Sequence, residues 1–129
     1  MFRHFYLQSP DGSEFDAIED GANACAFFVS SVLTIFNKIE AVHGTIASTI
    51  KDLEQSGWQV VEQPSPGDVI VWAPSETSLG HAHIGFYVGK NEAISTSASQ
   101  REVIRHELNF GSHKRKITHI YHLPNWEQT

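Results

Sequence analysis

Cys25 and His83 are the two residues of this sequence whose side chains could together perform covalent catalysis. Cys25 is the sole cysteine of the chain, and it stands at the start of a helix predicted from Ala24 to about Ile39. Unpaired backbone N–H groups and the dipole at a helix N-terminus favour an anion, so they would lower the pKa of a thiol. The position predicts a thiolate nucleophile, although lone cysteines on apolar helix faces are often buried and inert.

His83 could serve as the base that a cysteine nucleophile requires. It begins a predicted strand over residues 83–88, in which alternation places His83, Gly85 and Tyr87 on one face. Because Gly85 has no side chain, a backbone or a substrate could approach beside the imidazole. A histidine on a strand is more often structural, so the functional interpretation depends on its pairing with Cys25.

The elements expected to position these residues are helices first and strands afterwards. Apolar residues at helical spacing predict a buried helix over residues 24–39, and a second, more polar helix follows over 45–55. Residues 8–22 are polar and acidic, which predicts a surface loop. Turn signals separate the predicted strands, which cover residues 58–61, 69–72, 83–88, 92–97, 103–108 and 116–122. Helices grouped before an antiparallel sheet of about five or six strands indicate an α+β fold.

Length and composition restrict the classes of protein that the chain can belong to. The 129 residues suit one domain over 1–129, with 1–22 as an N-terminal segment that contains the acidic loop. Fifteen acidic residues against nine Lys and Arg give a net charge of −6, which disfavours nucleic acid as a partner. Neither a signal peptide nor a membrane-spanning stretch is evident, so we expect synthesis in the cytoplasm and no membrane partner.

Three motifs in this order resemble those of the NlpC-type papain-like cysteine peptidases and of their relatives, the CHAP domains. The motifs are NACAFFV at 23–29, PGDVIVW at 66–72 and HAHIGFYVG at 81–89, and the resemblance covers about residues 20–97. It implies a papain-like α+β domain, with the nucleophile helix packed on the sheet, that cleaves amide bonds without a cofactor. The substrate is usually a peptidoglycan peptide. Cys25 would be the nucleophile and His83 the general base and acid.

The resemblance also implies a third polar residue on the strand after the histidine strand. In this family it is usually His, Asn or Gln, whereas the chain offers Ser95 and Thr96. A hydroxyl can accept the N–H of His83, but it would stabilise the imidazolium less than a carboxylate would. We expect Thr96 to be the better candidate, because a longer polar side chain such as Asn often occupies this neighbourhood in related sequences. Tyr6 is the nearest match to the tyrosine that often precedes the nucleophile.

Two other functions remain open at this stage. The usual Asp-Cys-Ser-Gly around the nucleophile is Ala-Cys-Ala-Phe here, which is compatible with a catalytically dead module that binds cell wall. His81 and His83 point the same way on a strand, so a third histidine could complete a zinc site; candidates are His106, His113, His119 and His122. The loops 11–20 and 73–80 would flank the cleft, and the basic cluster 114–116 is interpreted as a solvated hairpin end. Phage lysis or a secretion system would deliver the protein to the cell wall.

Overall fold

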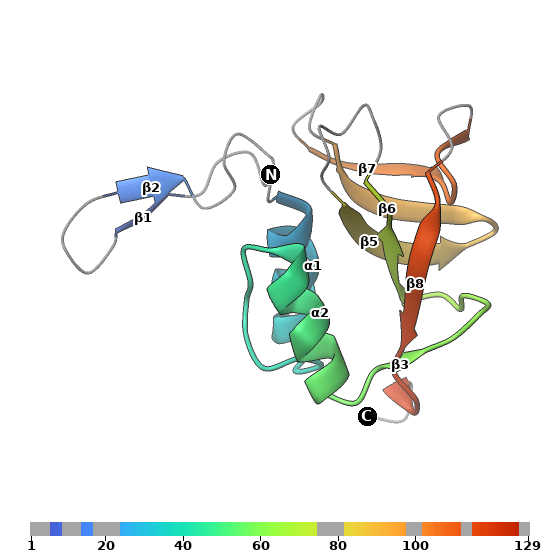
Figure 1. The fold of residues 1–129 in the computed structure, drawn as a ribbon, viewed down its shortest axis with the longest axis horizontal. Helices are drawn as coiled ribbons and strands as arrows, with labels where there is room; N and C mark the ends of the chain where they lie inside the picture. Colours follow the sequence, from blue (N-terminus) through green and yellow to red (C-terminus); the bar gives the residue numbers. More distant parts are fainter. Residues whose placement is uncertain are drawn as a thin grey trace.

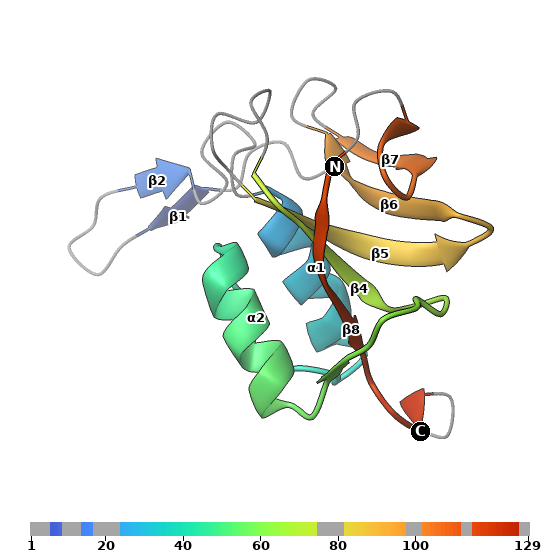
Figure 2. The same ribbon diagram turned by 45° about the vertical axis from the view of Figure 1, so that its right-hand side comes forward.

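The computed structural model places two helices against one face of an antiparallel sheet (Figures 1 and 2). It describes residues 6–8, 14–16, 24–74, 82–97, 102–111 and 115–126, with the backbone alone for the first two ranges. The helices are α1 (Ala24–Ile35) and α2 (Ile46–Gln55). Within these ranges neither helix combines the length and the apolar character that crossing a membrane would require. The α+β class predicted from the sequence is confirmed.

The main sheet has six strands, and every neighbouring pair is antiparallel. In spatial order they are β3 (Gln59–Val60), β8 (Ile117–His122), β4 (Val69–Trp72), β5 (His83–Gly89), β6 (Glu92–Ser97) and β7 (Glu102–Glu107). All six correspond to strands predicted from the sequence. The predicted bounds of β4 and β6 agree with the structure at both ends.

Helix α1 ends earlier than its apolar pattern predicts. Asn37 adopts a left-handed backbone conformation with φ 58°, and the backbone N–H of Lys38 donates to the carbonyl of Leu33. A residue in this conformation ends a helix, since it turns the chain away from the helical path. Ile35 and Phe36 are consequently 74% and 59% exposed, although both continue the helical spacing of the core residues.

The N-terminal segment contains a two-stranded ladder that the sequence analysis did not predict. Strand β1 (Tyr6–Gln8) pairs antiparallel with β2 (Glu14–Asp16), and Leu7 lies opposite Phe15. The prediction of an uninterrupted surface loop over 8–22 is therefore wrong for β2. Three residues are too short a run for alternation to be recognised among polar neighbours. The candidate N-caps of α1, Asp20 and Asn23, lie outside the described residues.

Both faces of the central strand β4 are buried, which explains why it reads as a continuous apolar run. Val69 and Val71 face α1 and share a core with Ile84 and Phe86 of β5. Ile70 and Trp72 face the other side, in a second cluster with Ala93 and Ile120. Strand alternation thus gives β5 an α1-facing side, which carries Ile84, and an opposite side, which carries His83.

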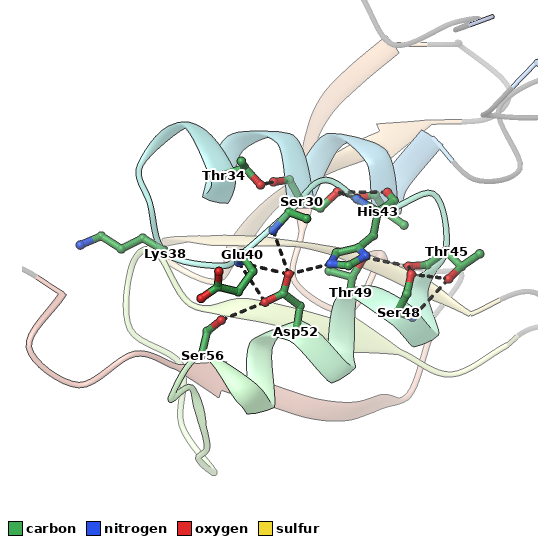
Figure 3. Close-up of polar contacts among 12 residues, drawn as sticks. Ser30, Thr34, Lys38, Glu40, His43, Thr45, Ser48, Thr49, Asp52 and Ser56 are labelled. Atoms are coloured by element: carbon green, nitrogen blue, oxygen red, sulfur yellow. Dashed lines mark hydrogen bonds and ion pairs between the residues drawn. The ribbon is translucent and has the colours of Figure 1, made fainter. Parts of the chain in front are cut away.

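Asp52 of α2 fixes the connection between the two helices (Figure 3). It is 5% exposed, and its carboxylate accepts the backbone N–H groups of Glu40 and Ala41 and the hydroxyl of Ser56. The Nε2 atom of His43 lies 2.6 Å from Asp52 Oδ2. Burial opposes ionisation of Asp52, but these hydrogen bonds outweigh it and lower its pKa to about 2. We call Asp52, His43 and Ser56, with the two backbone donors, the Asp52 cluster.

Ser30 of α1 connects its helix to the same segment. Its hydroxyl donates to the carbonyl of Ala26 in α1 and lies within hydrogen-bond distance of the His43 carbonyl, and it accepts the backbone N–H of His43 at 2.8 Å. Ser30 is fully buried. Polar contacts of Ser30 thus hold α1 to the connection between the two helices, while the apolar core packs α1 on the sheet.

Candidate active site

The N-terminus of α1 seats Cys25 against the beginning of β5. Cys25 is the second residue of the helix and is 3% exposed, as part of the core between α1 and the sheet. The backbone N–H of Ile84 donates a hydrogen bond to its sulfur. Ile84 directly follows His83, so the sulfur lies one residue from the histidine along β5. The predicted helix-start position of Cys25 is confirmed.

The prediction that Cys25 has a lowered pKa is wrong for this structure. Burial raises the pKa of the thiol, while the backbone N–H groups of Ile84, Ala26 and Cys25 itself and the charge of Arg115 lower it. The effect of burial is the largest, and the pKa lies above its ordinary value. The N-terminus of α1 therefore lowers the pKa of Cys25 as expected, but burial raises it by more. Cys25 is consequently a thiol at neutral pH.

The ring of His83 lies on the side of the sheet that carries Trp72 and Ser95, at the end of β5 where the adjacent Ile84 contacts Cys25. Its ring lies 5.5 Å from that of Trp72 and 5.7 Å from that of Phe110, centroid to centroid. Its Nε2 atom shares a hydrogen bond of 2.8 Å with Ser95 Oγ. Burial, followed by the charges of Arg115 and His106, lowers the pKa of His83 to about 3. The imidazole is thus neutral at neutral pH and can accept a proton.

Ser95, rather than Thr96, is the residue in contact with His83. Both belong to β6, and neighbours on a strand point to opposite faces of the sheet. Ser95 is fully buried and shares the face of His83, whereas Thr96 belongs to the other face. The expectation that Thr96 is the better candidate is therefore wrong, since the pairing of β5 with β6 places Ser95 opposite Gly85 on that face.

Gly85 makes the contact between His83 and Ser95 possible. A Cβ atom at this position would lie 2.5 Å from the carbonyl oxygen of Ile94 and 2.8 Å from Ser95 Cβ, distances that real Cβ atoms do not adopt. It would also lie 3.2 Å from the ring of Trp72. The sequence predicted space beside the imidazole at Gly85. The structure fills that space with Ser95 and Trp72.

His106 of β7 belongs to the same group of side chains, and the sequence analysis named it only as a possible zinc ligand. Its Nε2 atom lies 2.7 Å from Ser95 Oγ, and its ring stacks on Phe110 with centroids 4.0 Å apart. Burial lowers its pKa. The spacing of His83 and His106 in the sequence carries no signal of this proximity, because it depends on how β6 pairs with β7.

Arg115 is a second residue that the sequence analysis did not assign to the site. It was interpreted as part of a solvated basic cluster, but it is only partly exposed. Its Nη2 atom donates to the carbonyl of Ala73 at 3.1 Å, and its guanidinium carbon lies 5.7 Å from the ring centroid of Phe110. Its positive charge lowers the pKa of both Cys25 and His83, so it acts on the candidate nucleophile and the candidate base together.

The Pro-Gly-Asp turn at 66–68 has a structural role at the opposite end of β4. Asp68 accepts the backbone N–H of Ser65 at 2.8 Å and lies 2.7 Å from Nδ1 of His122. A cavity of about 340 Å³ adjoins this turn and is lined by Trp58, Ser65, Pro66, Gly67, Asp68, His122, Leu123, Asn125 and Trp126. Since β4 runs from this turn to Trp72, the cavity is separated from His83 by the length of the strand.

The zinc alternative required His81, which lies outside the described residues. Lys114 and most of the two loops predicted to flank the cleft, 73–80 and 11–20, also lie outside them. Of the third ligands considered, His113 is also outside them. Within the part of the chain that the structure describes, no three His, Cys, Asp or Glu side chains are grouped so that they could hold a metal ion. The side chain of Tyr6 is not described either.

A comparison of the sequence with protein-family models identifies a family that spans this site. The model of the NlpC/P60 family matches residues 20–122, which include all three motifs and the described residues from Ala24 to His122. The match supports the NlpC part of the sequence resemblance and does not extend to the CHAP domains. Among curated proteins, the comparison found no match.

Proposed function

Because the chain belongs to the NlpC/P60 family, and is thereby a hydrolase of the cell-wall peptidase type, we propose that Cys25 and His83 cleave an amide bond in peptidoglycan peptides. One observation carries the proposal. The sulfur of Cys25 accepts the N–H of Ile84, and the adjacent His83 has its Nε2 atom held by Ser95. Since Nε2 is engaged by Ser95, the proposal assigns the exchange of a proton with the thiol to Nδ1 of His83.

The first half of the proposed reaction acylates Cys25. His83 removes the thiol proton as the sulfur attacks the carbonyl carbon, so a C–S bond forms and the carbonyl electron pair moves onto oxygen. The proposal assigns the backbone N–H of Cys25 as a donor to this developing oxyanion. The intermediate then collapses, the C–N bond breaks, and the imidazolium of His83 gives its proton to the leaving amine.

The second half releases the acyl group. Water takes the place of the amine, His83 accepts one of its protons, and the hydroxide adds to the thioester carbonyl. The C–S bond breaks, the proton returns to the sulfur, and a carboxylic acid leaves. Since thiol and imidazole are both neutral beforehand, proton transfer accompanies the attack rather than preceding it.

Digestion of purified peptidoglycan, followed by mass spectrometry of the soluble fragments, tests this proposal. We expect fragments with a new amine and a new carboxylic acid, and the position of that bond distinguishes an endopeptidase from an amidase. The Cys25→Ala variant should release none, whereas the matched variant Thr96→Val, on the other face of β6, should retain activity.

Two results would contradict the proposal in different ways. Binding to peptidoglycan without turnover, together with no labelling of Cys25 by a thiol-directed electrophile, would favour the wall-binding module. Activity that survives Cys25→Ala and is lost to a chelator would favour the zinc hydrolase. The proposal also places the protein's action at the cell wall, after delivery by phage lysis or a secretion system.

A further inference from the structure

Three consecutive hydrogen bonds connect His83 to the backbone of β7. His83 Nε2 lies 2.8 Å from Ser95 Oγ, and Ser95 Oγ lies 2.7 Å from His106 Nε2. The Nδ1 atom of His106 lies 2.7 Å from the carbonyl oxygen of Glu107. The chain of bonds thus crosses from β5 through β6 to β7, and it ends on a main-chain acceptor.

The carbonyl oxygen of Glu107, at the end of this chain of hydrogen bonds, determines the donor and the acceptor in each of the three. A carbonyl oxygen can only accept, so Nδ1 of His106 must carry its proton. In a neutral imidazole the other nitrogen, Nε2, then has a lone pair and accepts the hydroxyl proton of Ser95. The Ser95 oxygen is left to accept from His83, so Nε2 of His83 carries the proton and Nδ1 has the lone pair.

We propose that His106 is a positioning residue that, through Ser95, holds His83 in the tautomer whose Nδ1 can take the proton of Cys25. The inference deepens the function proposed above and rests on it for its catalytic consequence. Ser95 alone cannot select this tautomer, because a hydroxyl can donate to His83 Nε2 as well as accept from it. His106 removes that ambiguity by engaging the hydroxyl proton.

The surroundings of His106 hold its ring in the orientation that this role requires. Phe110 stacks on the ring with an interplanar angle of 17° and has a backbone φ of 63°, which is unfavourable for a bulky residue. Its backbone N–H donates to the same Glu107 carbonyl, and Trp72 Nε1 donates to the carbonyl of Leu108. Backbone strain of this kind persists where the packing around it is specific, and it is common at functional sites.

Long-range ¹H–¹⁵N correlation spectra of the full-length protein test the inference without any need for turnover. They distinguish which ring nitrogen of each histidine carries the proton. At neutral pH we expect His83 protonated at Nε2 and His106 protonated at Nδ1. Either histidine in the opposite tautomer would overturn the inference, and this result needs no variant. A failure of the proposed function would leave the tautomers unchanged, so the two failures are distinguishable.

Two variants at His106 then separate positioning from packing. In His106→Leu, Ser95 loses its acceptor, and we expect a lower kcat by about 10- to 100-fold, as when an orienting group is removed, and a mixture of His83 tautomers. In His106→Gln, a carbonyl oxygen can accept the Ser95 hydroxyl, so kcat and the His83 tautomer should recover. Equal loss in both variants with an unchanged His83 tautomer would show a structural role and overturn the inference.

Non-additivity provides a check if His106→Leu folds poorly. Ser95→Ala removes the link between the two histidines, so adding His106→Ala to Ser95→Ala should change kcat by less than about twofold, although His106→Ala alone should lower kcat as His106→Leu does. A further large loss in this double variant would mean that His106 acts independently of Ser95, and it would overturn the inference.

Discussion

Two histidines of this molecule are held by hydrogen bonds from opposite kinds of partner. In the Asp52 cluster, His43 contacts a carboxylate whose pKa is lowered to about 2, so a negative charge is retained beside the ring. At the candidate active site, His83 contacts the uncharged hydroxyl of Ser95, and its own pKa is lowered to about 3. The first arrangement joins a loop to a helix, and the second keeps an imidazole neutral.

The difference shows why a hydroxyl suits the site. A carboxylate beside His83 would stabilise the imidazolium and favour a charged ring before any substrate arrives. Burial raises the pKa of Cys25, so its proton must be removed during attack, and a neutral imidazole is the form that can do so. The hydroxyl of Ser95 orients His83 without charging it.

Replacing each of the two histidines by alanine provides the strongest test of this comparison. His83→Ala should lower turnover at least about a thousandfold, because it removes the general base and acid. His43→Ala should leave kcat within about threefold but destabilise the protein by about 1–3 kcal/mol, because Asp52 loses a hydrogen-bond partner. Kinetics and chemical denaturation measure the two effects. Loss of turnover in both variants at equal stability would remove the distinction.

The neighbouring residues of β6 should differ in the same way, with a smaller effect. Ser95→Ala removes the partner of His83 Nε2, and we expect kcat to fall by about 10- to 100-fold. Thr96→Val is close in shape and lies on the other face, so kcat should change by less than about twofold. The converse ranking, measured by peptidoglycan digestion, would restore Thr96 as the orienting residue.

Acid should destabilise the two regions over different ranges of pH. The pKa of His83 falls from 6.5 to about 3 on folding, so below pH 6.5 the unfolded chain binds a proton that the folded chain does not. Stability should therefore decrease as the pH falls from about 6.5 towards 3, by up to about 1.4 kcal/mol per pH unit for one proton. Denaturation across this range should show a shallower slope for His83→Gln.

Asp52 should contribute only at lower pH. Its pKa falls from 3.8 to about 2 on folding, so the stability that its ionised form provides is lost as the pH falls from 3.8 towards 2. Asp52→Asn should leave the slope between pH 6.5 and 4 unchanged. A change of slope there would mean that the Asp52 cluster, and not His83, governs the onset of acid unfolding.

The smallest expected effect concerns Arg115 and Cys25. Alkylation of Cys25 should show an inflection above the ordinary pKa of 9.0, because burial exceeds the effects that lower it. Arg115→Met removes a positive charge and should move the inflection further upward, by less than about one pH unit. Arg115→Lys retains the charge and serves as the control. An inflection below 9.0 in the unaltered protein would restore the low-pKa thiol.

Most of the fold follows from local patterns. The apolar run of β4 and the turn before it were predicted from the sequence, and so was the face of His83 on β5. The early end of α1 was not, because Ile35 and Phe36 continue the apolar period and the left-handed conformation of Asn37 leaves no strong signal.

The site was less predictable, because it depends on strand register. The β5–β6 pairing is irregular between Tyr87 and Gly89, where the register shifts by one residue. Without this bulge, Thr96 rather than Ser95 would lie opposite Gly85, since a shift of one residue moves every side chain to the other face. The place of His106 requires the β6–β7 register as well, and no local pattern in the sequence specifies it.

The part of the site on β7 should open more easily than the part on β5, because β7 is an edge strand. It ends the sheet, and in the described part of the chain it pairs with β6 alone and consists of exposed and partly buried residues. An edge strand of this kind exchanges its amide hydrogens through local fraying that costs less free energy than global unfolding. His106 would leave Ser95 in each such excursion, while Cys25 and His83 stay in place. Mild denaturant should therefore slow turnover before far-UV circular dichroism detects global unfolding.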